Sequence, residues 1–582
     1  MITAVQASIR SERSRIGADP WPGIMLAVVL AASVIIISQL VMVIWLSFTD
    51  GTPGLDAVHT TEHYQTIFTD TFTLDVLLNT LGFSASTLVV ALIFGVPIAW
   101  IAERTDFPGK TLLYTIMTIG LVLPGFTTAM GWTFLLNPKM GALNFWLIEF
   151  FALDGPPFAI NTVFGMGWVQ GLNLATVIFV MTAATFRAMD PTLEEAAYMC
   201  GAGFRSTWLS VTMRLAWPGI LAASIFVFTM AFAAFDVPAV IGLGSRIFTF
   251  STYILVLLNP DDSLPKYGAV AALSTIVLAL AGALSWWYSN VQKSARRYAV
   301  VTGKGYRPRI TQLGGWVWLA WGVVAVYFVL SKLMPFLVLV WVSLLPFVQA
   351  PTAAAMNFVS FDNFLSLDWN QISRALTNTG ILMVLTPTLT LMMSVCFSWI
   401  VLRSKIPGRS WFDFIAFLPH AVPNIVFAVA ALLLTLFVID KVIPIYGSVW
   451  VLLLVFVIGN ISYATRMTNS GLIQINRELD ECASTCGANA GAVMAAVLIP
   501  LLAPTMIYAW LWMALLAYRE LTLAVLLTSV DNVTLPVLIW NTWLGGNSGV
   551  SAALSLVLVM GLVPLIAVYW YVVQRRGGTI RA

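Results

Sequence analysis

Long apolar stretches separated by short polar segments recur along the whole chain. Each has about 20 residues or more, and a helix of that length crosses a hydrocarbon layer about 30 Å thick. The strict apolar and polar alternation of membrane β-strands is absent, so we expect helices. The pattern predicts twelve spans, at residues 24–48, 76–102, 111–136, 162–186, 217–243, 267–291, 317–345, 376–402, 411–438, 446–468, 504–528 and 548–573.

The composition agrees with an integral membrane protein. Hydrophobic residues make up 59% of the chain and charged residues only 9%, whereas soluble proteins have about 25% charged residues. The first apolar stretch, 24–48, is longer than the core of a signal peptide, which has about 7–15 residues, so we expect a retained span. The sequence therefore predicts an all-α polytopic membrane protein.

The second half of the chain repeats the first. Trp100 and Arg104 recur 299 residues later, whereas Glu195 and Gly201 recur 286 residues later. The difference implies about 13 extra residues in the first half, which we assign to the aromatic-rich loop 137–161 and its expected interfacial helix. Because each half has six spans, an even number, we expect two tandem parallel six-helix repeats.

The basic residues predict the orientation. Most of the 29 Lys and Arg residues lie in the amino-terminal segment, the even-numbered connections and the tail, so these segments are expected in the cytoplasm. The predicted organisation is a cytoplasmic segment 1–23, a first permease-like repeat 24–291, a basic linker 292–315, a second repeat 316–573 and a cytoplasmic tail 574–582. The linker suits anionic lipid headgroups of the membrane, and we expect no nucleic-acid site there.

Two polar stretches lie at equivalent places in connections predicted to be cytoplasmic. The first contains Glu195, Ala196, Ala197, Gly201 and Ala202, and the second contains Glu481, Cys482, Ala483, Gly487 and Ala488. Alanine-rich sequence favours a helix, and the glycine permits a turn after it. A short exposed helix that carries a glutamate is typical of a docking element. A helix lying on the membrane surface would explain one such stretch, but not two at matched positions.

Both stretches resemble the Glu-Ala-Ala loop of the permeases of binding-protein-dependent ABC importers. The second copy also continues to the expected Val497-Leu498-Ile499-Pro500. The first copy departs from the family pattern because Arg214 stands at the proline position, and in the second copy Cys482 replaces the first alanine. We therefore expect the two copies to meet their partners differently. Residues 518–527 and 535–540 resemble the fused twelve-span permeases of the ferric-iron class, whose relatives move aminoethylphosphonate, polyamines, thiamine or sugar phosphates.

The resemblance implies a type I ABC importer permease fold in the bacterial inner membrane, with both termini cytoplasmic. It implies that two copies of an ABC ATPase subunit dock on the two polar stretches, so that their ten residues form coupling helices. It also implies an external substrate-binding protein that delivers a small solute, either ferric iron or a related phosphonate, sugar phosphate or polyamine. ATP and magnesium would be bound by the ATPase subunits. The chain itself is then a transporter subunit without cofactor, metal or catalytic residue.

A phosphate-binding loop is not expected in this chain. Gly109-Lys110-Thr111 has the ending of such a loop, but Arg104 stands where its first glycine should be, and no strand precedes it. Cys482 and Cys486 share a helix face, but no His or further Cys lies nearby to complete a metal site. Small packing residues are the simpler interpretation of both cysteines.

Several ionisable residues fall within or near the predicted spans, where such groups usually face a cavity or a partner. Asp236, His420, Arg519 and Glu520 are the candidates for a pathway or gate, because residue 522 is the repeat equivalent of Asp236. The alternatives are ion pairs between packed helices and, for His420, a hydrogen-bonded packing histidine. Lys332 is expected to extend its amine to the membrane surface, or to mark a span that begins later than residue 317.

Two other functions compete with the importer. A secondary transporter with twelve spans also has parallel halves, but it has no reason to keep a Glu-Ala-Ala and Gly motif in matched loops. A membrane-embedded enzyme would need a His or Asp cluster, and the chain has only three histidines.

Overall fold

The computed structural model describes residues 21–50, 57–190, 192–260, 264–295 and 311–577. Almost all of the predicted amino-terminal segment, most of the basic linker and the end of the tail lie outside the described residues. The described part is almost entirely helical, and its one sheet is an antiparallel hairpin of β1 (Thr49–Asp50) and β2 (Val58–His59). Ten of its helices are long and apolar enough to cross a membrane, and three bent helix pairs raise this number to as many as thirteen. The all-α polytopic class and a number near twelve are confirmed.

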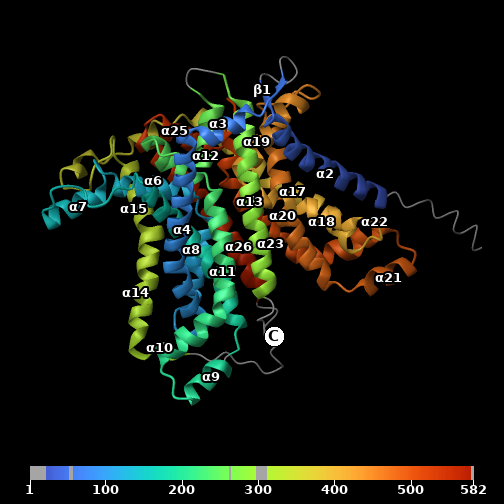
Figure 1. Cartoon of the computed structure of the whole chain (residues 1–582), viewed down its shortest axis with the longest axis horizontal. Helices are drawn as coiled ribbons and strands as arrows, with labels where there is room; N and C mark the ends of the chain where they lie inside the picture. Colours follow the sequence, from blue (N-terminus) through green and yellow to red (C-terminus); the bar gives the residue numbers. More distant parts are fainter. Residues whose placement is uncertain (1–20, 51–56, 191, 261–263, 296–310, 578–582) are drawn as a thin grey trace, which may run out of the picture.

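The helical elements of the first half are α2 (Trp21–Leu46), α3 (Glu62–Thr69), α4 (Thr71–Arg104), α5 (Lys110–Val122), α6 (Gly125–Leu136), α7 (Ala142–Phe151), α8 (Val163–Ala188), α9 (Thr192–Met199), α10 (Phe204–Thr207), η1 (Trp208–Thr212), α11 (Met213–Phe232), η2 (Pro238–Gly242), η3 (Leu243–Ser245), α12 (Phe250–Leu258) and α13 (Tyr267–Ala295). Figure 1 shows α4, α8, α11 and α13 running beside one another, with β1, α3 and α12 at one end and α9 and α10 at the other.

The helical elements of the second half are η5 (Gly314–Trp316), α14 (Val317–Phe328), η6 (Val329–Leu333), α15 (Met334–Ser343), η7 (Ala355–Phe358), α16 (Asp362–Leu365), α17 (Trp369–Leu402), α18 (Arg409–Ala421), α19 (Asn424–Leu434), η8 (Thr435–Ile439), α20 (Val449–Gln474), α21 (Arg477–Thr485), α22 (Ala490–Val493), η9 (Met494–Leu498), α23 (Ile499–Tyr518), α24 (Thr522–Val525), α25 (Leu535–Leu544) and α26 (Ser548–Gly577). The order of long helices follows that of the first half.

The third span of each half is broken at the same place. The pair α5 and α6 is bent by 95°, and the pair α18 and α19 by 108°. In each half a proline follows the last helical turn, and the residue before it, Leu123 or Val422, is extended with ψ of 136° or 131°. Proline disfavours helical geometry at the preceding residue, so the two breaks follow directly from Pro124 and Pro423.

The fifth and eleventh spans differ from the predicted boundaries. The fifth ends at Phe232 rather than residue 243, and the eleventh ends at Tyr518 rather than residue 528. Both also begin earlier, at Phe204 and Ala490. The charged residues that the prediction placed inside these spans lie just beyond the observed ends, in the turns that lead to shorter helices. Turns place polar side chains at a cavity without exposing them to lipid, which a continuous span could not do.

The first span of each half packs against the other half. Helix α2 contacts α17, α18 and α19, whereas α14 and α15 contact α4 and α6. Within each half the second and fourth spans, α4 with α8 and α17 with α20, lie against each other. The α4 and α8 backbones approach closely because Gly171 faces Val90, where an added Cβ would lie 2.5 Å from the valine Cβ. Small residues allow such close helix packing in membranes.

An additional helix, α7, occupies the loop 137–161, as predicted for this stretch. Its last two residues, Phe150 and Phe151, are 82% and 61% exposed. Asn144 holds the helix to the bundle, because its amide donates hydrogen bonds to the carbonyl oxygens of Leu136, Asn137 and Phe158.

Candidate coupling helices and central cavity

The two predicted docking stretches form the short helices α9 and α21. They follow the fourth span of each half, α8 and α20, and Figure 1 shows both on the lower side of the bundle, away from β1 and α3. Each begins after a polar turn. In α21 the Asn476 side chain accepts a hydrogen bond from the Glu478 backbone and caps the first turn.

Both helices end with the same glycine turn. In α9 the Gly201 amide bonds to the Tyr198 carbonyl and the Ala202 amide to the Ala197 carbonyl. The same pair of bonds recurs in α21 at Gly487 and Ala488. This pattern needs a left-handed residue after the helix, and the two glycines supply it with φ of 83° and 87°. The predicted turn at each glycine is therefore confirmed.

The predicted docking residues lie on the outside of both helices. Glu195, Ala196 and Gly201 are exposed, as are Glu481, Cys482 and Gly487, whereas Ala197, Ala202, Ala483 and Ala488 are half-buried. Met199 is 89% exposed at the end of α9. An exposed apolar side chain beside an exposed carboxylate is a surface that a partner can cover.

A buried ion pair attaches α9 to the end of α4. Arg104 Nη2 lies 2.7 Å from Glu194 Oε2, and the two residues are only 2% and 7% exposed. Glu194 Oε1 also accepts a hydrogen bond of 2.7 Å from the Thr212 hydroxyl, at the end of η1. Glu194 is the one buried residue of α9. A single carboxylate thus joins the docking helix to the second and fifth spans.

The second half has an equivalent but more exposed ion pair. Arg403, the repeat equivalent of Arg104, places Nε 3.2 Å from Asp480 Oδ2, and its Nη2 donates to the carbonyl oxygens of Leu472 and Ile475. The Asp480 side chain is 21% exposed. Burial raises the pKa of Asp480, while the positive charges of Arg403 and Arg477 lower it and only partly offset the burial. The attachment of α21 is therefore weaker than that of α9.

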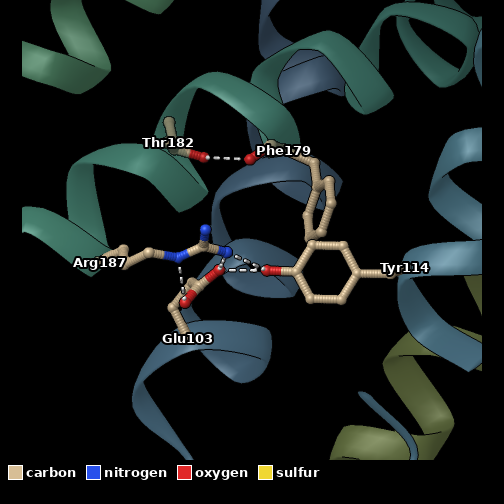
Figure 2. A network of polar contacts seen from close by, with 5 residues as sticks. All are labelled: Glu103, Tyr114, Phe179, Thr182 and Arg187. Atoms are coloured by element: carbon tan, nitrogen blue, oxygen red, sulfur yellow. Dashed lines mark hydrogen bonds and ion pairs between the residues drawn. The ribbon is translucent and has the colours of Figure 1, made fainter. Parts of the chain in front are cut away.

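A second ion pair lies beside Arg104 and is shown in Figure 2. Glu103, on the same turn of α4, accepts hydrogen bonds from Arg187 Nη2 at 2.5 Å and from Nε at 3.2 Å. The Tyr114 hydroxyl of α5 donates to the same carboxylate. Adjacent residues of opposite charge on α4 therefore hold opposite charges on the two sides of the turn that joins α8 to α9. In the second half Leu402 takes the place of Glu103, so this pair has no equivalent there.

The inward-facing residues of the docking helices were missed from the sequence. We expected Glu195 and Glu481 to matter, and they are exposed, but their neighbours Glu194 and Asp480 make the ion pairs. The signal was present, because Arg104 recurs as Arg403 and an acid occupies position 480. A basic residue at the end of a span was interpreted only as a sign of orientation.

A cavity of about 510 Å³ lies between the two halves. Its lining includes all four predicted pathway residues: Asp236, His420, Arg519 and Glu520. Side chains of α8, α11 and α13 from the first half face those of α18, α20 and the turn after α23. The proposed grouping of these four residues, which are widely separated in the sequence, therefore holds in the structure.

The charged groups of the cavity contact the opposite half. Thr522 Oγ1 donates a hydrogen bond of 3.1 Å to Asp236 Oδ1, and Arg519 Nη1 donates one of 2.9 Å to the Leu123 carbonyl. Leu123 is the residue at which the third span breaks. Glu520 Oε1 accepts from the Leu523 amide at the start of α24. The break in one half is thus held by an arginine of the other.

His420 both lines the cavity and packs among aromatic rings. Its ring centroid lies 5.1 Å from that of Tyr463, 5.6 Å from Phe417 and 6.4 Å from Phe226. Its backbone amide donates to the Ser462 hydroxyl. The two interpretations of this residue therefore both apply to its position.

The expectation for Lys332 was wrong. The residue does not extend to a surface, because it lies in η6 in the middle of the seventh span and is 7% exposed. The span does not begin late either, since it starts at Gly314. Within the described residues the Lys332 Nζ has no hydrogen-bond partner, and it lies 3.4 Å from the place where a Cβ would stand on Gly120. Its stem is too far from both ends of the span to reach water.

The cysteines of the docking helices are free thiols. Cys200, Cys482 and Cys486 are exposed, and Cys396 is half-buried within α17. Among the residues that the structure describes, no group of three or more His, Cys, Asp or Glu side chains is placed to hold a metal ion.

Comparison with known proteins identifies the family. The family described as "Binding-protein-dependent transport system inner membrane component" matches residues 95–297 and again residues 394–577, which together are more than half of the chain. The chain belongs to this family. Each half of this inner membrane permease holds one copy, and each copy contains one of the helices α9 and α21. The resemblance inferred from the Glu-Ala-Ala loops and the division into two permease repeats are confirmed.

Two fused permeases are similar over most of the chain. The ferric transport system permease protein FbpB of Actinobacillus pleuropneumoniae is 22% identical over 95% of this chain and 78% of its own length. The Fe(3+)-transport system permease protein FbpB 2 of Haemophilus influenzae is 21% identical over 84% of this chain and 87% of its own. The molybdenum transport system permease protein ModB of Escherichia coli is 29% identical, but over only 27% of this chain. The chain is accordingly a permease subunit of an ABC importer.

Proposed function

We propose that this permease forms the pathway by which an ABC importer carries ferric iron across the inner membrane. Two ATPase subunits dock on α9 and α21 at the cytoplasmic face, and an external substrate-binding protein delivers the iron at the opposite face. Both termini lie in the cytoplasm. ATP and magnesium are bound by the ATPase subunits, and hydrolysis takes place there.

The observation that carries the proposal is the matched pair of helices α9 and α21. Each is short, exposed and closed by a left-handed glycine, and each is ion-paired to an arginine at the end of the second span of its half. An isolated helix of this length is marginal in water, so its attachment must come from the bundle or from a partner. Two such helices at equivalent positions suit two copies of one partner subunit.

Alternating access follows from where these helices are attached. When ATP draws the two ATPase subunits together, α9 and α21 approach each other, and the ion pairs move the second spans with them. The cavity between the halves is lined by residues of both, so a relative movement of the halves changes which end of it is open. Coupling is therefore mechanical.

Ferric iron is the solute because the relatives that match most of the chain carry this name. The relatives named for molybdenum, galactooligosaccharides or diacetylchitobiose match 27 to 37% of it. The cavity also presents two carboxylates, Asp236 and Glu520, with Asn173 and Tyr463 nearby in its lining. Oxygen ligands of this kind suit a hard cation during transit.

The native thiols provide a direct test of docking. Cys200 reports on α9, and Cys482 reports on α21. In chains that keep one of these cysteines and carry serine at the others, bound ATPase should slow maleimide labelling several-fold at both positions. Vesicles that contain the complex, ATP and the binding protein should accumulate radiolabelled ferric iron. Failure of any ATPase to copurify, together with uptake that follows a proton or sodium gradient without ATP, would overturn the proposal.

A further inference from the structure

The side chains of Arg104, Glu194 and Thr212 meet at one point beneath α9. Glu194 lies 2.7 Å from Arg104 through one oxygen and accepts a 2.7 Å hydrogen bond from Thr212 through the other. These three residues belong to α4, α9 and η1, so they connect the docking helix with two membrane spans. We call them the coupling joint.

We propose that the coupling joint is the positioning device that passes movement of α9 to the second and fifth spans. This inference rests on the proposed function, because it assumes that an ATPase subunit docks on α9. It goes beyond that function by assigning roles to three residues that the partner does not touch.

Burial makes the joint stiff. Arg104 is 2% exposed, Glu194 is 7% exposed and Thr212 is 3% exposed. Charged groups attract each other more strongly away from water, and removing one member of a buried pair leaves the other uncompensated. Since Glu194 is the one buried residue of α9, a force on the exposed face of this helix reaches the bundle chiefly through this carboxylate.

The joint leads to the cavity by two routes. Thr212 continues into α11, whose residues Phe226, Thr229 and Met230 line the cavity. Arg104 lies beside Glu103, which holds Arg187 of α8, and α8 contributes Asn173 to the same lining. A displacement of α9 is therefore transmitted to helices on one side of the cavity.

The second half provides a natural comparison. Leu498 occupies the position equivalent to Thr212, so the carboxylate of Asp480 has no hydroxyl donor from the fifth-span equivalent. Asp480 is also shorter and more exposed than Glu194. The two docking helices are thus attached unequally, and α9 is the one tied to both spans.

The test uses the chain with its copurified ATPase subunits in proteoliposomes, with the binding protein and radiolabelled ferric iron. Glu194→Gln removes the charge but keeps the shape of the side chain. Thr212→Leu removes only the hydroxyl and copies the second half, where leucine already fits this position. We expect both variants to bind the ATPase and to keep Cys200 protected from maleimide, while iron taken up per ATP hydrolysed falls several-fold, more in Glu194→Gln.

A charge exchange separates positioning from a merely structural role. Arg104→Glu alone should be strongly impaired, and Arg104→Glu combined with Glu194→Arg should recover much of the lost uptake per ATP, because opposite charges face each other again. Glu62→Gln, an exposed carboxylate on α3, is the matched control and should behave as wild type. Wild-type uptake per ATP in Glu194→Gln, with docking intact, would overturn the inference.

The outcomes also distinguish this inference from the proposed function. If wild-type chain binds no ATPase, the proposed function fails before the joint is tested by its variants. If wild type binds the ATPase but the variants lose docking and inserted protein together, the joint is only part of the folded scaffold, and the inference is wrong.

Discussion

Thr522 donates a hydrogen bond to Asp236 across a sequence separation of 286 residues, which is the repeat offset of this part of the chain. The two residues are therefore equivalent positions of the two halves, in contact with each other. Equivalent positions can touch only close to the axis that relates the halves. The contact lies at the cavity, so the axis passes through the region where the halves must separate during transport.

Thr522→Val should loosen this contact. Loss of one hydrogen bond to a carboxylate that lines a cavity is worth about 1 kcal/mol, or roughly a fivefold shift between conformations. We expect the basal ATPase rate of the complex, without binding protein, to rise by up to that factor. Thr229→Val is the control, because the Thr229 hydroxyl bonds within its own helix to the Ile225 carbonyl. An unchanged basal rate in Thr522→Val would mean that the contact does not restrain the halves.

Arg519→Met should impair both stability and uptake. The arginine holds the Leu123 carbonyl at the break of the third span and lies near Asp236 and Glu520. Its removal leaves these carboxylates uncompensated and should cost about 2 kcal/mol. Thermal unfolding in detergent and iron uptake measure the two effects. Adding Glu520→Gln to the variant should restore part of the unfolding temperature, and a double variant no more stable than the single one would contradict this explanation.

The sequence predicted the arrangement of spans better than their ends. Apolar runs continue past Phe232 and Tyr518, so hydrophobicity alone could not show that the fifth and eleventh helices stop there. Asp236 and Arg519 marked the true breaks, but a charged residue within an apolar run is equally compatible with a continuous helix facing a cavity. Only the packing of both halves around that cavity distinguishes the two cases.

The docking helices were predicted in place but not in orientation. Adjacent residues on a helix point about 100° apart, so the pair Glu194-Glu195 must present one carboxylate inward and one outward. Spacing within the motif does not show which. That depends on Arg104, which is 90 residues earlier in the chain and meets Glu194 only after α4 and α8 have packed.

Glu195→Arg combined with Glu481→Arg should prevent docking without affecting insertion. Both glutamates are exposed and make no ion pair within the described residues, so reversing their charge leaves the helices in place. We expect the ATPase no longer to copurify and maleimide labelling of Cys200 to become independent of it. Glu62→Arg tests for a general effect of the charge. Full ATP-driven uptake by the double variant would exclude α9 and α21 as docking helices.

Asp480→Asn should be tolerated better than Glu194→Gln. Burial raises the pKa of Asp480 above its ordinary value of 3.8, and the attraction of Arg403 and Arg477 does not fully oppose this effect. A carboxyl whose pKa is raised in the folded state favours folding most when protonated, so its contribution to stability declines as pH rises from about 3.8 through the folded pKa. The asparagine variant should lack this part of the pH dependence and should unfold near the wild-type temperature at neutral pH. Glu194→Gln should unfold at a clearly lower temperature, because it leaves Arg104 buried and unpaired. Unfolding temperatures of the three proteins across this pH range measure both differences, and equal losses in the two variants would show that the attachments of α9 and α21 are equivalent after all.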